Sequence, residues 1–72
     1  MKIVNVFRTS VKNKKDIKLL ATHLENIPEI SHWNFDLVDY NSILRVVSEM
    51  DIKKEVIGVL RKRNFDCEEL PD

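Results

Sequence analysis

Two short polar side chains, Asn13 and Asp16, flank a pair of lysines where an apolar segment gives way to a charged one. An amide and a carboxylate could share a hard cation, but together they fall short of the oxygen cage that such a cation needs. The same spacing is typical of a helix start, because an Asn side chain accepts a hydrogen bond from the second or third helical amide. We therefore predict that Asn13 caps a helix and that Asp16 reaches back to the amide of the cap residue.

The other side chains that could do chemistry are one cysteine and two histidines. A lone Cys67 excludes a disulfide or an all-cysteine metal site within one chain. We expect it to be a small buried hydrophobe whose pKa is raised by the adjacent Glu68 and Glu69. His23 and His32 show no spacing typical of metal ligands. No Ser/His/Asp or Cys/His/Asp set and no glycine-rich phosphate loop stands out, so the sequence predicts a protein that is not an enzyme and has no cofactor.

Hydrophobic patterning predicts the elements that must position these residues. Strands are rich in β-branched or alternating apolar residues, and helices carry apolar residues at helical spacing. The predicted elements are strand 2–11, helix 14–27, strand 32–39, strand 42–49, a helix carrying Ile52 to Leu60, and strand 64–70. Pro28 ends the first helix, Asp51 can cap the second, and a turn is expected at 39–41. Gly58 would let the second helix approach a neighbour closely.

The order strand-helix-strand-strand-helix-strand predicts an α+β fold. With right-handed crossovers it gives a ferredoxin-like two-layer sandwich, in which two helices cover one face of a four-stranded antiparallel sheet. The 72 residues form one domain, 1–72, near the lower size limit for a chain that folds without disulfides or metals. Strands would lie in the order fourth, first, third, second.

This topology leaves one sheet face without a helix. If Phe7 faces the helices, then Val4, Val6, Ile43 and Val47 face outward, which is unusually apolar for an uncovered face. We expect these four residues to bind a protein partner or a second copy of the chain. The alternative is that they were selected for strand propensity alone.

Two clusters of basic side chains lie at the connection from the first strand to the first helix and at the connection from the second helix to the last strand. In the predicted topology these two connections share one end of the domain. The candidates for binding an anion or an acidic partner are Lys12, Lys14, Lys15, Arg61, Lys62 and Arg63. A helix N-terminus beside them would also favour anions. The alternative is an ordinary solvated surface. A net charge of zero argues against nucleic acid as a partner.

Residues elsewhere match a known pattern: Phe7, Thr9 and Val11 alternate before the loop at Asn13, and apolar positions follow without gaps at Leu20, Leu24, Ile27, Ile30, Trp33 and Phe35. The aromatic residue Phe65 follows the second predicted helix. In these positions the chain resembles the heavy-metal-associated domain, the fold of small copper chaperones and of modules in metal-transporting ATPases. The resemblance covers about residues 5–67 and implies the same ferredoxin-like fold.

The metal motif of that family is not present here. By the resemblance, its two cysteines fall on Asn13 and Asp16, whose amide and carboxylate do not replace thiolates for a soft ion such as Cu(I). Lys12, Lys14 and Lys15 surround the loop and would repel a cation further. The resemblance therefore implies the scaffold without copper transfer, and we expect a noncatalytic interaction module. A metal carrier with non-standard ligands and a small-molecule-sensing regulatory domain remain as alternatives.

The sequence also bears on location. No apolar run approaches the length of a membrane span, and the start of the chain lacks a basic-then-apolar signal. We therefore expect a cytoplasmic protein without a membrane partner.

Overall fold

The computed structural model describes residues 2–38 and 42–71 and contains six elements. They are β1 (Ile3–Thr9), α1 (Lys14–Glu25), β2 (Ile30–Asp36), β3 (Ile43–Ser48), α2 (Lys53–Lys62) and β4 (Cys67–Glu69). The predicted number, type and order of elements are therefore confirmed. The turn predicted at 39–41 lies outside the described residues.

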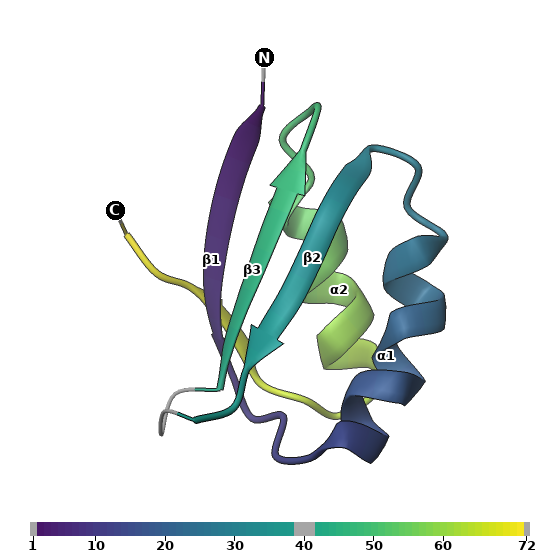
Figure 1. Ribbon diagram of the computed structural model, residues 1–72, viewed down its shortest axis with the longest axis vertical. Coiled ribbons are helices and arrows are strands. Elements are labelled where there is room, and N and C mark those ends of the chain that lie inside the picture. The colour runs from purple at the N-terminus through teal and green to yellow at the C-terminus, as the bar shows by residue number, and fades with distance from the viewer. Residues whose placement is uncertain (1, 39–41, 72) are drawn as a thin grey trace.

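The four strands form one antiparallel sheet in the order β2-β3-β1-β4. Both helices lie on one side of the sheet, and β1 and β3 are its inner strands (Figure 1). The register pairs Val4 with Val47 and Phe7 with Leu44 between β1 and β3. This arrangement confirms the predicted α+β class and strand order, and it is consistent with a ferredoxin-like fold.

Alternation along the strands sends one set of side chains to the helices and the other to solvent. Phe7 and Leu44 are fully buried on the helix side, where they meet Leu20 of α1 and Leu60 of α2 in one apolar cluster. The complete buried cluster consists of Phe7, Val11, Leu20, Leu24, Leu44, Val46, Ile52, Val56, Leu60 and Cys67. Because the whole core lies between the sheet and the helices, the opposite sheet face is left to solvent.

The ends of the elements differ from the predicted bounds by a few residues. Helix α1 ends at Glu25 with Asn26 as its C-cap, before Pro28, because a proline disfavours helical backbone in the residue that precedes it. Asp51 is not the cap of α2: the N-cap is Ile52, although an Asp51 carboxylate oxygen accepts a hydrogen bond from the Lys53 amide at 3.3 Å. The carboxylate thus binds a free amide of the first helical turn, although Asp51 is the residue before the N-cap.

Gly58 does not serve a close approach, contrary to the prediction. A Cβ atom built at this position would meet nothing within 4 Å. Residues Ile27, Lys54, Val59 and Lys62 are among those that line a shallow groove over it. Glycine therefore costs α2 backbone entropy without a packing gain.

Gly58→Ala is expected to raise the free energy of unfolding by about 0.5–1 kcal/mol, because alanine restores helix propensity in open space. Urea melts would measure the change. The control is the reverse substitution in the other helix, Ala21→Gly, which should lower the free energy of unfolding by a similar amount. If Gly58→Ala left the free energy of unfolding unchanged or lowered it, the finding that no neighbouring group packs against Gly58 would be contradicted.

Candidate functional site

Asn13 and Asp16 meet at the start of α1, as predicted. The Asn13 backbone is extended, with φ −152° and ψ 171°, and its side-chain oxygen accepts a hydrogen bond from the Asp16 amide at 2.9 Å. The Asp16 carboxylate accepts from the Lys12 amide at 3.3 Å, one residue before the predicted partner. The pair therefore forms a reciprocal helix cap, and both polar side chains are engaged in ordering the loop.

Asn13→Ala is expected to lower the free energy of unfolding by about 0.5–2 kcal/mol, because the first turn of α1 loses its side-chain acceptor. Asn13→Ser and Asn13→Asp keep an acceptor and should be nearly neutral. Urea melts of the three variants test the account. Equal stability of the alanine variant and the unmodified protein would show that the Asn13 side chain does not stabilise the helix.

The loops β1–α1 and α2–β4 lie side by side at one end of the domain (Figure 1). The Ser10 amide donates to the Asp66 carbonyl oxygen at 3.2 Å, and the Asp66 amide donates to the Ser10 hydroxyl at 2.7 Å. This is the end at which we expected the two basic clusters to gather. The hydrogen bonds fix the loops, but they do not by themselves bring the lysines and arginines together.

Two of the three basic residues near the end of α2 bind the protein itself. Arg61 donates to the Cys67 carbonyl oxygen at 3.2 Å, and Arg63 donates to the Val59 carbonyl oxygen at 3.0 Å. A second guanidinium nitrogen of Arg63 lies 2.9 Å from Nδ1 of His23 on α1. Because a guanidinium can only donate, Nδ1 must accept in this contact. These arginines therefore serve helix packing and the link to β4.

The histidines are not brought together. His23 lies on α1 against Arg63, whereas His32 lies on β2 and is exposed on the helix-free side of the sheet. Across residues 2–38 and 42–71, no group of three or more His, Cys, Asp or Glu side chains could hold a metal ion. Neither of the helices described here has the length and the apolar character that a membrane span requires.

Cys67 is buried, with 2% of its surface exposed. Burial raises the pKa of its thiol to about 11, and the nearby Arg61 guanidinium offsets only part of that rise. The predicted direction was right, but the cause is desolvation rather than the adjacent glutamates. The thiol is therefore protonated at neutral pH and poorly suited to nucleophilic or redox chemistry.

The helix-free face of the sheet carries the predicted valines. Val4 is 51% exposed and pairs with Val47, whose side chain is half-buried, as is that of Val6. Ile43 lies on the same face but pairs with Arg8 rather than with a valine. Sequence reasoning missed Leu70, whose amide donates to the Val6 carbonyl oxygen at 2.8 Å, so that its side chain continues the outward alternation beside Val6. We call Val4, Val6, Val47 and Leu70 the sheet-face patch.

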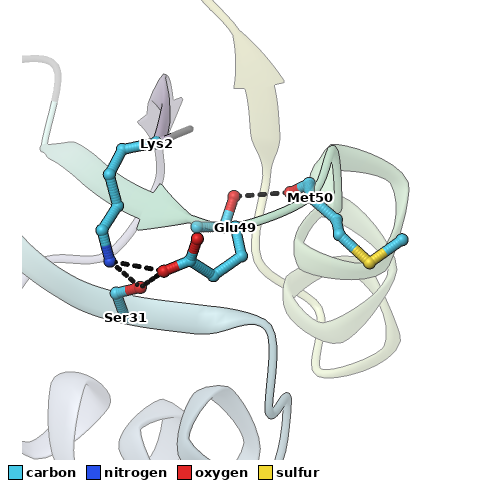
Figure 2. A network of polar contacts seen from close by, with 5 residues as sticks. Lys2, Ser31, Glu49 and Met50 are labelled. Carbon is cyan, nitrogen blue, oxygen red and sulfur yellow. Dashed lines mark hydrogen bonds and ion pairs between the residues drawn. The ribbon is translucent and has the colours of Figure 1, made fainter.

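Two ion pairs stand at the borders of the sheet-face patch. Lys2 approaches Glu49 at 2.6 Å and donates to the Ser31 hydroxyl at 2.8 Å, and Figure 2 shows these three side chains converging. The hydrogen bond and the charge of Lys2 lower the pKa of the Glu49 carboxyl. On the other side, Arg8 approaches Glu68 at 2.6 Å. An apolar centre with a polar border is the usual composition of a binding surface.

Asn5 is a buried polar residue on the helix side of β1, only 7% exposed. Its side-chain nitrogen has no hydrogen-bond partner among the described residues. Sequence reasoning did not single it out, although its even spacing from Phe7 within an apolar strand was a signal that it would face the core.

Comparisons of the chain with protein-family models, with curated proteins and with solved structures gave no match.

Proposed function

We propose that the domain is a noncatalytic interaction module that binds a protein through the sheet-face patch. The observation that carries the proposal is a group of aliphatic side chains on a sheet face that no helix of the described residues covers: Val4 is exposed there, and Val6, Val47 and Leu70 are half-buried. Burying a fully exposed aliphatic side chain contributes about 1.5–3 kcal/mol before the costs of association, and a side chain that is already half-buried contributes only part of that.

The proposed scaffold is that of the heavy-metal-associated domain, with a helix cap in place of the metal motif. Two observations support this part of the proposal. The strand order is the one that the resemblance implies, and the side-chain oxygens of Asn13 and Asp16 accept hydrogen bonds from backbone amides. No specific observation among the described residues favours a metal carrier or a small-molecule sensor. A cytoplasmic location and the exclusion of nucleic acid stay predictions.

Two variants matched in exposure test the proposal. Val4 on the sheet face and Leu19 on α1 are each 51% exposed. Val4→Lys is expected to reduce the binding of an apolar-surface fluorescent dye, because it places a charge inside the patch, whereas Leu19→Lys should leave dye binding unchanged. Equal effects of the two substitutions, or no dye binding by the unmodified protein, would contradict a binding surface on this face. Circular dichroism spectra would show that both variants fold.

A further inference from the structure

The outer edge of β2 offers backbone groups that pair with no other strand of the described residues. In an antiparallel ladder, alternate residues turn their amide and carbonyl toward the same neighbour. The Glu49 amide donates to the Glu29 carbonyl oxygen at 3.0 Å, so the odd-numbered residues of β3 bond toward β2. Their partners His32, Asn34 and Asp36 therefore bond to β3. It follows that the backbone groups of Trp33 and Phe35 point away from the sheet.

The two edge strands of the sheet differ in the features that hinder pairing with a strand of another chain. Strands at an edge are usually kept short, or carry charges, proline or a bulge that hinder pairing with another chain. Strand β4 has three residues, two of them glutamates, and Pro71 follows shortly after it. Strand β2 has seven residues, no proline and no lysine, and its one irregularity lies at its start, between Ile30 and His32. The five residues from 32 to 36 thus form a regular and open edge.

Half-buried aromatic rings accompany this edge. Trp33 and Phe35 lie on the helix side in an edge-to-face arrangement, with ring centroids 6.0 Å apart. Their neighbours Asn34 and Asp36 are exposed on the other side. An added strand would therefore gain backbone hydrogen bonds from Trp33 and Phe35 and an apolar contact with their rings.

The geometry points to a second copy of this chain as the added strand, paired antiparallel through β2 about a two-fold axis at Asn34. In this register Trp33 of one copy lies opposite Phe35 of the other, and His32 lies opposite Asp36. Asn34 meets its own counterpart, and two amide side chains can hydrogen-bond to each other. Every cross-strand pair then joins compatible side chains, which is the pattern that stabilises adjacent strands.

The alternative registers are less favourable. Sliding the two strands so that Trp33 lies opposite Trp33 of the other copy places Asp36 opposite Ile30. Sliding them the other way, so that Phe35 lies opposite Phe35 of the other copy, places His32 opposite Val38. Only the register centred on Asn34 matches each polar side chain with a polar one across the five residues.

This inference does not depend on the sheet-face patch. The two-fold axis runs perpendicular to the sheet, so both sheet-face patches would lie on the same side of one continuous sheet. Association through β2 thus leaves the patches free for another partner.

Hydrogen exchange of single amides tests the edge directly. In NMR spectra, the amides of Trp33 and Phe35 should become protected as protein concentration rises, because they gain acceptors on the second copy. The amides of His32 and Asn34 bond to β3 and should be protected at every concentration. Fast exchange of Trp33 and Phe35 at all concentrations up to the solubility limit would overturn the inference.

Sedimentation equilibrium of two lysine variants distinguishes a dimer interface at the β2 edge from one at the sheet-face patch. Asn34→Lys brings two like charges together at the axis and should raise the dimer dissociation constant by about tenfold or more. Val6→Lys lies in the sheet-face patch and should leave that constant unchanged. The reverse result would place the interface on the sheet face, overturning this inference while supporting the proposed function. An unmodified protein that is monomeric at all concentrations would also overturn it.

A side-chain exchange tests the register. His32→Asp alone places two carboxylates opposite each other and should weaken the dimer. Adding Asp36→His to the same chain restores complementary pairs and should return the dissociation constant toward its original value. Failure of the double variant to recover, with both variants folded by circular dichroism, would rule out the register centred on Asn34.

Discussion

Replacing Asn5 with valine is expected to raise the free energy of unfolding by about 1–3 kcal/mol. The side-chain nitrogen of Asn5 is buried without an acceptor among the described residues, so folding removes it from water without compensation. Valine fills a similar space, suits an inner strand and buries apolar atoms against the core. Urea melts of the two proteins would measure the difference.

Asn5→Asp is the matched control. A carboxylate at this position would be buried with the same lack of partners and should lower the free energy of unfolding. Lower stability of Asn5→Val would show that the amide contributes a favourable interaction, and would direct attention to an ordered water molecule as its partner.

The second large effect is the gain of a soft-metal site by the double variant Asn13→Cys, Asp16→Cys. The two positions lie at the N-cap and in the first turn of α1, close enough that the side chain of one accepts from the amide of the other. Two thiols there could both reach one Cu(I) ion, and the positive helix end favours the thiolate form. We expect Cu(I) binding in an anaerobic titration against a bathocuproine competitor, with none by the unmodified protein.

The single cysteine variants are the controls and should bind Cu(I) much more weakly, because one thiolate cannot complete the site. Buried Cys67 should not contribute. The double variant loses the helix cap, so its stability should fall by about 1–2 kcal/mol in the absence of metal. A folded double variant that does not bind Cu(I) would argue against the register of the family resemblance.

The sequence predicted the order of elements because each carries a clear hydrophobic period. It also predicted the capping pair at Asn13 and Asp16, whose interaction is local. The predicted cap at Asp51 was wrong by one residue, whereas the other predictions that failed involve the neighbours of a residue in space. The role of Gly58 depends on what packs against α2, and the cause of the raised Cys67 pKa depends on burial, which the adjacent glutamates do not reveal.

The sheet face was predicted in part for the same reason. Alternation identified Val4, Val6 and Val47 as outward residues, but it could not show that Leu70 extends β4 beside Val6. The open edge of β2 was also missed, because which amides of a strand are free depends on the direction of its pairing with a neighbour. That property follows from the register between β2 and β3 rather than from residue types.

The sheet topology has a consequence for the order of folding. Strands β2 and β3 are adjacent in the sequence, so their pairing closes a short loop, whereas β1 must reach β3 across α1 and β2, pairing Arg8 with Ile43. Long closures cost more chain entropy and are slower, so we expect the β2–β3 hairpin to form before β1 joins it. The hairpin would then expose the regular edge of β2 while the core is still open. Crowded chains would meet at this edge before they are folded, and the yield of refolding would decrease as chain concentration increases.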